Sequence, residues 1–384
     1  MHALLTSFLR TAFVGLALLG LAACSLFSPH DPRNDPSPLT EYEPAISSRV
    51  VWDVPIGSGF GYGFAPFSDG QLVYAATPDG AVVAVDLSSG SIRWRADAGT
   101  KLSAGVGSDG QISAVAAPDG TVIAFDYQGK ELWQAKASSQ VDVPPAVGSG
   151  VVVVRSSDYR IQAFDARDGE LLWSVQRPGP ALALKTTMQM IIVEDMLISG
   201  MPNGRLIAIS LPDGNVLWEG TVAVSRGATD LDRISDVVGA PQIVGPLLCG
   251  VAYQGRIVCF NVAEGGFPLW EHDFSSTSGL ASDPEQLYAA SPRDTVYAFD
   301  IETGEERWSQ NALRNRRLSG PAVVPQALAV GDYEGYLHFL GRFDGRLLGR
   351  LQLGSRGIVS PLLATARGVI AQTRSGNLVL VELN

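Results

Sequence analysis

The strongest constraint on the fold of this chain is a short phrase of residues that returns about every forty positions, a period typical of propellers and solenoids. The phrase has a small residue, an apolar residue and an aspartate, then a glycine and finally a tryptophan. The chain has seven tryptophans, and all of them hold this one position, which chance does not explain. The copies are Ala84-Val85-Asp86 with Gly90 and Trp94, Ala124-Phe125-Asp126 with Gly129 and Trp133, Ala163-Phe164-Asp165 with Gly169 and Trp173, Ala298-Phe299-Asp300 with Gly304 and Trp308, the degenerate Ala208-Ile209-Ser210 with Gly214 and Trp218, Cys259-Phe260-Asn261 with Gly265 and Trp270, and Phe343-Asp344-Gly345, where Gly349 replaces the tryptophan; Trp52 is the seventh tryptophan.

Each repeat unit has the pattern of four short antiparallel strands. An apolar run, a turn such as Pro78-Asp79-Gly80 and a second β-rich run precede the phrase. Within the phrase the aspartate can accept hydrogen bonds from N–H groups of its own turn, and the glycine can adopt positive φ. The phrase therefore predicts a tight turn between the third and fourth strands. The tryptophan on the fourth strand is expected to point into the neighbouring unit, where burying ~200 Å² of indole contributes roughly 5 kcal/mol before entropy is counted.

The two ends of the chain complete each other. The last residues, 376–383, read as a third strand with no fourth strand after it, whereas Val50-Val51-Trp52-Asp53 supplies a tryptophan strand with no three strands before it. We expect the N-terminal strand, residues 48–55, to complete the last unit, so that the ring has no open seam. The sequence thus predicts an all-β, eight-bladed β-propeller over residues 47–384.

The N-terminal residues have the layout of a secretory signal. Arg10 is followed by an apolar run that is too short to span a bilayer, and the run ends in Leu21-Ala22-Ala23-Cys24. This ending matches a bacterial lipobox, in which the cysteine thiol is lipidated after residues 1–23 are removed; the alternative is an ordinary signal cut nearby. Ser25 follows the cysteine where an aspartate would indicate inner-membrane retention, so we expect a lipid anchor in the outer membrane, facing the periplasm. Residues 24–46, rich in proline and poor in large apolar residues, are expected to form a flexible tether.

Charge and cysteine content narrow the functional classes. The net charge is −11, and −12 once Arg10 is removed with the signal, which argues against nucleic acid or an anionic lipid surface as partner. Cys249 and Cys259 flank a hairpin-like stretch and could form a disulfide across a strand pair in an oxidising compartment; two buried free thiols are the alternative. No Cys/His cluster has the spacing of metal ligands, so we expect no metal site and no cofactor.

The repeat phrase resembles the tryptophan-docking repeat of pyrroloquinoline-quinone propellers over nearly all of the mature chain. Together with a lipoprotein signal, it resembles the BamB family of the outer-membrane barrel assembly machinery. Three stretches carry that likeness: Pro180-Ala181-Leu182-Ala183-Leu184-Lys185-Thr186, Asp230-Leu231-Asp232-Arg233-Ile234-Ser235-Asp236-Val237 and Gly331-Asp332-Tyr333-Glu334-Gly335-Tyr336-Leu337-His338. The resemblance implies a non-enzymatic scaffold that binds the periplasmic polypeptide-transport-associated (POTRA) domains of the barrel subunit BamA.

Two other functions compete with the scaffold. One is a quinone-dependent dehydrogenase on the same ring, but such enzymes resemble one another in a vicinal Cys-Cys pair, a calcium site and long pocket-forming insertions, and this chain has no Cys-Cys pair and no long insertions. The other is a chaperone that captures unfolded barrel strands, or other nascent outer-membrane proteins, by β-augmentation. Nothing in the sequence singles out an edge for that role.

Extra chain is concentrated in two adjacent units. Neighbouring tryptophans are mostly 38 to 42 positions apart, but Trp173 to Trp218 spans 45 positions and Trp218 to Trp270 spans 52. The extra residues lie in two loops of the same connection type, 177–186 and 224–239, so we expect the loops to be neighbours on one face and to carry function.

The resemblance assigns the partner-binding residues to these loops. They are Leu182, Leu184, Lys185, Arg233 and Asp236, with Leu182 and Leu184 as a small apolar core and Asp236 expected at the rim, where it would pair with a basic residue of the partner. The alternative is that the leucines merely start a blade strand and the acidic residues solvate a loop. The chain departs from the family pattern at Lys185, where an arginine is expected, and at Val238, where an acidic residue is expected.

Overall fold

The computed structural model describes residues 31–384 except residues 59–60, 62, 181 and 359. Residues Ser37–Asn384 form one compact unit. Of the residues before it, Pro32–Asn34 form a single 3-10 turn, η1. No helix among the described residues is long and apolar enough to cross a bilayer. The expected signal segment and Cys24 lie outside the described residues.

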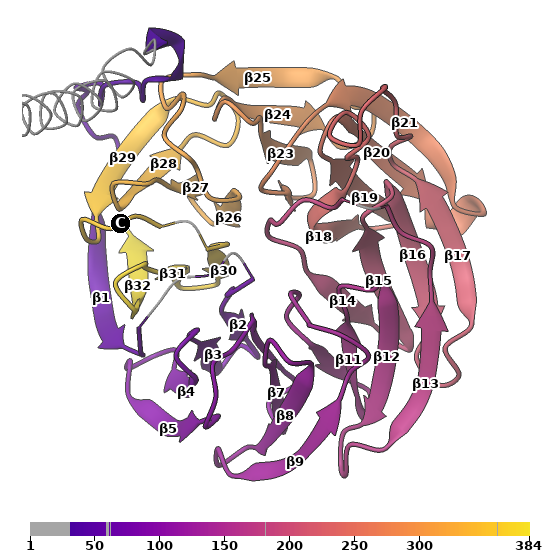
Figure 1. Cartoon of the computed structure of the whole chain (residues 1–384). Helices are drawn as coiled ribbons and strands as arrows, with labels where there is room; N and C mark the ends of the chain where they lie inside the picture. Colours follow the sequence, from indigo (N-terminus) through magenta and orange to yellow (C-terminus); the bar gives the residue numbers. More distant parts are fainter. Residues whose placement is uncertain (1–30, 59–60, 62, 181, 359) are drawn as a thin grey trace, which may run out of the picture. The chain divides into compact units, whose positions relative to one another are not determined.

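In the described residues, Ser37–Asn384 contains eight four-stranded antiparallel sheets arranged as blades around a ring (Figure 1), which confirms the predicted propeller. In blades 1 to 7 the chain runs from the innermost strand to the outermost. Blade 1 comprises β2 (Phe67–Ser68), β3 (Leu72–Ala76), β4 (Ala81–Asp86) and β5 (Ile92–Asp97); blade 2, β6 (Ala104–Ser108), β7 (Ile112–Ala116), β8 (Thr121–Asp126) and β9 (Glu131–Lys136); blade 3, β10 (Ala146–Gly148), β11 (Val151–Arg155), β12 (Arg160–Asp165) and β13 (Leu171–Gln176); blade 4, β14 (Met190–Val193), β15 (Met196–Met201), β16 (Arg205–Ser210) and β17 (Val216–Thr221).

The second half of the ring repeats this arrangement, with a short 3-10 turn, η2 (Val262–Glu264), inserted in blade 5. Blade 5 comprises β18 (Val237–Val244), β19 (Leu247–Ala252), β20 (Gly255–Asn261) and β21 (Phe267–Phe274); blade 6, β22 (Leu280–Ser282), β23 (Gln286–Ala290), β24 (Val296–Asp300) and β25 (Glu306–Gln310); blade 7, β26 (Ala322–Val324), β27 (Ala327–Gly331), β28 (Tyr336–Leu340) and β29 (Leu347–Gln352); blade 8, β30 (Leu363–Thr365), β31 (Gly368–Gln372), β32 (Asn377–Leu383) and β1 (Ser48–Pro55).

The repeat phrase forms the turn between the third and fourth strands, as predicted. In blade 1 the Asp86 carboxylate accepts hydrogen bonds from the backbone N–H groups of Ser88 (3.1 Å) and Ser89 (2.9 Å), and Gly90 has φ +72°. A Cβ on Gly90 would lie 2.6 Å from the side chain of Trp52, which belongs to the preceding blade. The glycine is therefore required both for the turn and for the close approach of the indole.

The tryptophans connect each blade to the next. Trp133, Trp173 and Trp270 are nearly buried, and their Nε1 atoms donate to backbone carbonyls of the following blade at 2.9, 2.6 and 2.8 Å. The core clusters accordingly combine side chains from two adjacent blades. The same contact is made by Trp52 on Gly90, Trp94 on Gly129, Trp133 on Gly169, Trp173 on Gly214, Trp218 on Gly266, Trp270 on Gly304 and Trp308 on Gly345.

Three copies of the phrase differ from that of blade 1. In blade 7, Phe339-Leu340-Gly341 hold the positions of Ala84-Val85-Asp86, so the predicted Phe343-Asp344 lies inside the turn and only Gly345 holds its expected position. In blade 5 the glycine under Trp218 is Gly266, not Gly265, because η2 lengthens the turn by one residue. In blade 2 the turn between Asp126 and Gly129 is one residue shorter than that of blade 1. The buried Nε1 of Trp94, which packs on this shorter turn, has no hydrogen-bond partner among the described residues.

The N-terminal strand closes the ring, as predicted. β1 pairs with the C-terminal strand β32 from Ser48 opposite Leu383 to Pro55 opposite Asn377. Asn384 N donates to Ser47 O at 2.9 Å, and Arg49 forms a 2.7 Å ion pair with Glu382. Blade 8 therefore lacks a chain connection between its third and fourth strands and depends on this pairing.

The expected tether is shorter than the sequence indicated, because residues 37–46 pack against blade 7. Ala45 N and Ile46 N donate to Leu348 O at 2.8 and 3.2 Å, and Arg350 Nη1 donates to Thr40 O at 2.8 Å. Ile46 lies against Gly349, at the place where the other blades carry a tryptophan. Blade 8 offers no repeat turn on which a tryptophan of blade 7 could dock, so Ile46 fills that space.

Cys249 and Cys259 lie directly opposite each other on β19 and β20. Their Cα atoms are 4.1 Å apart and their sulfur atoms are joined as a disulfide. Both residues are fully buried between blades 5 and 6, in a cluster that includes Trp270 and Phe299. The bond links the two middle strands of the blade that bears the longer of the two loops.

Candidate protein-binding site

The first loop, residues 177–186, leaves the end of β13 and is supported by Tyr159. The hydroxyl of Tyr159 donates to Pro180 O at 2.9 Å. A Cβ on Gly179 would lie 1.8 Å from the Tyr159 ring, so the chain crosses the ring at a distance that only glycine permits. Arg177 forms an ion pair with Glu219 of β17. The loop is thus fixed by contacts with blades 3 and 4.

The second loop, between β17 and β18, is organised by its own side chains. The Asp232 carboxylate accepts from Thr229 N at 3.1 Å and from Thr229 Oγ1 at 2.7 Å, and Arg233 Nε donates to Gly227 O at 3.2 Å. Ser225 and Ser235 are hydrogen bonded at 2.8 Å. The loop ends at Asp236, so the last three residues of the expected range, 237–239, belong to β18.

The two loops are neighbours in space, as expected from their connection type. The backbone N–H of Leu184 donates to Asp236 Oδ2. Next to this contact, Gly239 N donates to Thr187 O at 2.8 Å and Gln189 N donates to Gly239 O at 3.2 Å. A single surface on one face of the ring is therefore built from both loops. We call it the two-loop surface and define it as residues 182–186 and 224–236.

Asp236 does not lie at the rim of this surface, contrary to the expectation from the sequence. Its side chain is fully buried, and Oδ1 has no hydrogen-bond partner among the described residues. Burial raises the pKa of Asp236 to about 6, although the Leu184 N–H and the charge of Arg155 oppose the rise. Asp236 therefore positions the first loop from below, and a partner protein cannot reach its carboxylate in this conformation.

Arg155 is the buried cation near this carboxylate, and its role was not predicted from the sequence. Its guanidinium donates to Gly200 O, and Nη2 lies 2.8 Å from Met188 Sδ. Burial lowers the pKa of Arg155 to about 10, and the charge of Asp236 opposes that change. The only available signal was an arginine at the end of the apolar run Val151–Arg155, where all five residues are buried.

Of the five partner-binding residues expected from the sequence, Leu182, Lys185 and Arg233 remain available to a partner. Leu182 is 45% exposed, and the Lys185 side chain is 76% exposed. Leu184 is half-buried against the apolar cluster of blade 5, which includes Val238, so it presents only part of its surface. Val238, which stands where an acidic residue was expected, is buried and adds no charge.

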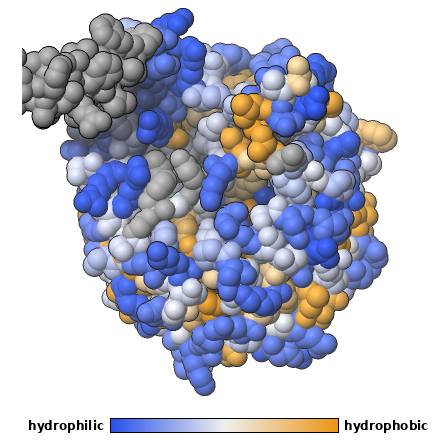
Figure 2. Space-filling model, in the orientation of Figure 1, coloured by the Kyte–Doolittle hydropathy of each residue, from blue (hydrophilic) through white to orange (hydrophobic). Residues whose placement is uncertain are grey.

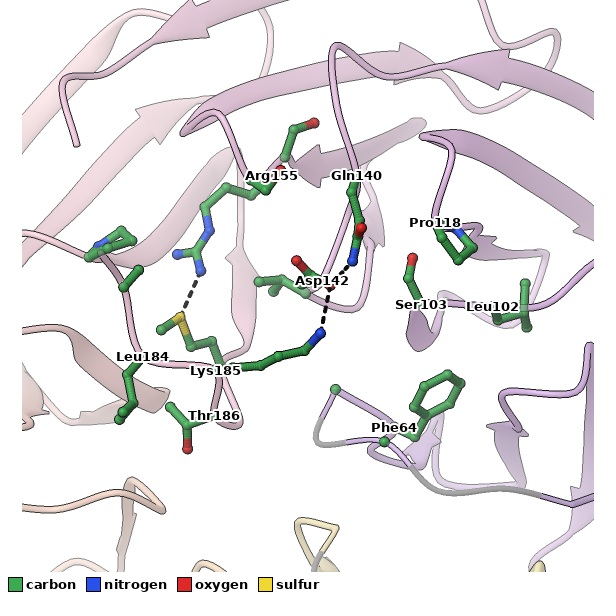
Figure 3. A pocket seen from close by; sticks show the side chains of 18 of the residues that line it. Phe64, Leu102, Ser103, Pro118, Gln140, Asp142, Arg155, Leu184, Lys185 and Thr186 are labelled. Carbon is green, nitrogen blue, oxygen red and sulfur yellow. Dashed lines mark hydrogen bonds and ion pairs between the residues drawn. The ribbon is translucent and has the colours of Figure 1, made fainter. Parts of the chain in front are cut away.

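A cavity of about 580 Å³ adjoins the first loop (Figure 3). Leu184, Lys185 and Thr186 line one side of it, and Phe64 and Leu102 line another. Lys185 Nζ lies 4.0 Å from Asp142 Oδ1, which also accepts from Gln140 Nε2 at 2.6 Å. An exposed pair at that distance contributes little to stability, so Lys185 is free to turn toward a carboxylate of a partner.

The family of the chain follows from comparison with known proteins. A sequence model described as outer membrane protein assembly factor BamB matches residues 40–99, 78–310 and 293–384. The protein of that name from Bordetella pertussis is 56% identical over 375 residues, 98% of this chain and 97% of that protein. This chain belongs to the BamB family. BamB of Burkholderia pseudomallei is 36% identical over 361 residues, which cover 94% of each chain.

Solved structures agree with the fold. The crystal structure of BamB from Moraxella catarrhalis matches with a TM-score of 0.79 at 23% identity, covering 88% of this chain and all of that one. A quinohemoprotein alcohol dehydrogenase from Comamonas testosteroni matches with a TM-score of 0.67 at 14% identity, covering 88% of this chain and 76% of that enzyme. Both likenesses concern the propeller itself and carry no activity across.

The third stretch that carried the BamB likeness lies in blade 7, away from the two-loop surface. Asp332 Oδ2 lies 2.8 Å from Arg316 Nη2 and 2.9 Å from His338 Nε2, and all three side chains are buried. Burial alone would raise the pKa of Asp332. Three contacts, in decreasing order of effect with His338, the Tyr336 N–H and Arg316, together keep this pKa below its usual value. Arg316 Nη1 also donates to Ser37 O at 2.9 Å, so this network holds the segment before β1.

We expect the stability of the chain to report the buried state of Asp236. A raised carboxyl pKa in the folded state contributes stability below pH 4 that is lost as the pH rises through about 6. Relative to an Asp236→Asn variant, the parent should therefore lose about 2 kcal/mol between pH 4 and 6, or a few degrees of melting temperature, and change little above pH 7. Thermal unfolding of both proteins at matched pH values measures this. A difference that does not vary with pH would show that Asp236 is solvated.

Proposed function

We propose that this chain is a non-enzymatic scaffold lipoprotein of the outer-membrane β-barrel assembly machinery, and that its two-loop surface binds the POTRA domains of BamA. The observation that carries the proposal is the joining of the two loops by the bond between Leu184 and Asp236, which presents Leu182, Lys185 and Arg233 together on a closed ring. A pre-formed surface of this kind binds without a large ordering cost. The names of the relatives, outer membrane protein assembly factor, support the same role.

The composition of the two-loop surface suits a protein partner. The exposed apolar side chains of this surface are Leu182, Val224 and Leu231, with part of Leu184, and the exposed Lys185 and Arg233 add positive charge. The two basic side chains favour an acidic patch on the partner. Lysine cannot form the bidentate contact of an arginine, so we expect the contact at Lys185 to be set by charge more than by geometry.

Affinity purification of the lipidated protein from its own envelope tests this proposal. We expect BamA to be recovered with the parent chain and to be depleted when Leu182 is replaced by Asp. Identification of the recovered proteins by mass spectrometry decides the outcome. Recovery of BamA at equal yield with both chains would place the contact elsewhere on the ring.

We also propose that Cys24 carries the lipid anchor, since it follows Leu21-Ala22-Ala23 at the end of an apolar run. Cys24→Ala should move the mature protein from the membrane fraction to the soluble periplasmic fraction, because the acyl chains supply the membrane affinity. Fractionation followed by immunoblotting measures the change. An unchanged membrane fraction would contradict the assignment, whereas loss of export would show that the signal is of another type.

A further inference from the structure

Every blade has a β-bulge in its outermost strand, just before the tryptophan position. In blade 3, for example, Ala163 pairs with Trp173 and Phe164 pairs with Leu171, so Leu172 has no partner in the ladder. A bulge re-aims the side chain of the extra residue. The bulge residues around the ring are Arg93, Leu132, Leu172, Leu217, Leu269, Arg307, Leu348 and Val51 in blades 1 to 8.

Four consecutive blades carry an exposed leucine at this position. The leucines of blades 2 to 5 are 42%, 46%, 56% and 48% exposed. Further exposed apolar side chains precede these leucines in blades 3 to 5. Figure 2 shows apolar side chains along the right-hand and lower rim of the ring, where Figure 1 places the outer strands of these blades. We call this set the leucine rim and define it as Leu132, Leu171, Leu172, Val216, Leu217, Phe267 and Leu269.

The other four blades avoid an exposed apolar residue at the bulge. Arg93 in blade 1 forms a 2.5 Å ion pair with Asp86, and Arg307 in blade 6 forms the equivalent pair with Asp300. Leu348 in blade 7 is half-buried and accepts the hydrogen bonds of Ala45 and Ile46, and Val51 in blade 8 is half-buried against the core. Arginine at the bulge is therefore compatible with the turn, and the four leucines are not a requirement of the fold.

The outer strands of blades 2 to 5 also have a free edge. β9, β13, β17 and β21 are each the last strand of their sheet and pair on one side only. An exposed edge with apolar side chains is a template for adding another strand, and folded proteins usually protect such edges with charge or cover. Charge protects blades 1 and 6, and residues 37–46 cover blade 7.

Blade 7 shows how a bulge edge receives a chain segment. Residues 37–46 have no regular secondary structure and lie along β29, with two backbone N–H groups directed at the bulge carbonyl and Thr40 O accepting from Arg350. The contact combines these backbone hydrogen bonds with side chains of the segment: Ile46 lies against Gly349, and Arg350 pairs with Glu41 at 3.2 Å and lies over the ring of Tyr42 at 5.6 Å. The backbone part of the contact can be made by any extended segment, and the side chains add to it.

We propose that the leucine rim binds extended segments of another polypeptide that carry apolar side chains at alternating positions. The free strand edge supplies backbone hydrogen bonds, and the leucines supply apolar contacts. The exposed Glu131, Glu170 and Asp273 on or beside these strands favour basic residues near the ends of such a segment. The net charge of −11 disfavours an anionic lipid surface as the occupant.

The leucine rim is separate from the two-loop surface. Leu171 and Leu172 begin β13, whereas the first loop leaves the other end of that strand after Gln176. Variants of one surface should therefore spare the other, and the proposal does not depend on binding of BamA.

Fluorescence anisotropy with the lipidated full chain in phosphatidylcholine nanodiscs tests the leucine rim. The probe is a labelled twelve-residue peptide that alternates valine or tyrosine with threonine and has a lysine at each end. We expect Leu172→Arg combined with Leu217→Arg, which copies the arginines of blades 1 and 6, to weaken binding at least tenfold. The matched control, Ile243→Arg with Phe343→Arg, replaces two exposed apolar residues that lie outside both the leucine rim and the two-loop surface, and it should bind the probe like the parent.

Two controls, a sedimentation measurement and a vesicle-binding measurement decide the interpretation. A peptide with serine in place of valine and tyrosine should not bind, and the rim variant should keep the melting temperature of the parent within a few degrees. Equal binding of the probe to the parent and the rim variant, or no binding to either, would overturn the proposal. So would a parent that self-associates through these leucines in sedimentation, or that binds peptide-free vesicles through them.

Discussion

Replacing Leu182 with Asp should weaken the complex with the POTRA domains of BamA at least tenfold. Leu182 is 45% exposed on the two-loop surface, and burying this exposed part contributes roughly half of the 1.5 to 3 kcal/mol of a whole leucine, which corresponds to about a 3- to 10-fold change in Kd. The charge introduced at the centre of the contact adds a desolvation cost, so the measured loss should lie at or above the upper end of this range. Titration of the purified domains against the folded chain by calorimetry measures it.

A second replacement distinguishes binding from folding. Leu184→Asp added to Leu182→Asp should weaken the complex further, but Leu184 is half-buried against blade 5, so the double variant is also expected to melt earlier. Leu182→Asp alone should melt within a few degrees of the parent. The matched control is Leu132→Asp, which replaces a leucine of similar exposure, 42%, on blade 2 and should leave the affinity for BamA unchanged. Parental affinity in the folded Leu182→Asp protein would refute the assigned interface.

The ring itself was predictable from the sequence because the signal is local and repeated. Each turn needs its own aspartate and glycine, and each blade contact needs its own tryptophan, so seven copies of one phrase specify the architecture several times over. The sequence shows that Gly349 replaces the tryptophan of blade 7, but it does not show why a tryptophan is absent there. Ile46 fills that space, and no local rule connects residues three hundred positions apart.

The site was predictable in its location and less so in its chemistry. The long intervals between Trp173, Trp218 and Trp270 located both loops, because insertions into a regular repeat must leave the ring at the connections. Whether Asp236 faces solvent depends on how the first loop folds over it, and the sequence of the loop does not encode that contact. A cluster of acidic residues in a loop usually predicts a solvated surface, but one member of this cluster, Asp236, is buried.

The exposure of the bulge residues at the edge of each blade could likewise not be predicted from the sequence. The residue before each tryptophan is readable, but its exposure depends on the bulge that removes it from the ladder. The contrast between Arg93 or Arg307 and the four leucines becomes meaningful only once all of these residues are known to hold the same structural position.

Removing the N-terminal strand should have the largest effect on the stability of the ring. A chain that starts at Gly57 lacks all of β1, which pairs with β32 from Ser48 to Pro55, and it lacks Trp52, whose Nε1 donates to Leu87 O at 3.1 Å in blade 1. Loss of a buried tryptophan alone costs about 3 to 5 kcal/mol, and the unpaired edge of β32 adds to this. We expect the melting temperature to fall by roughly 10 °C or more and the transition to broaden, since blades next to the gap can open separately.

Two further start points separate strand pairing from the packing of the preceding segment. A chain that starts at Ser37 keeps every described contact of the propeller unit and should melt like the parent. A chain that starts at Ser47 keeps β1 but loses Ile46 over Gly349 and the hydrogen bonds of Ala45 and Ile46 to Leu348. Its melting temperature should therefore lie between those of the other two chains. Calorimetry of the three chains measures the order. If the chain from Gly57 melts at the temperature of the chain from Ser37, closure of the ring by β1 contributes nothing to its stability, and the eight-bladed ring must be held by the other seven contacts between blades.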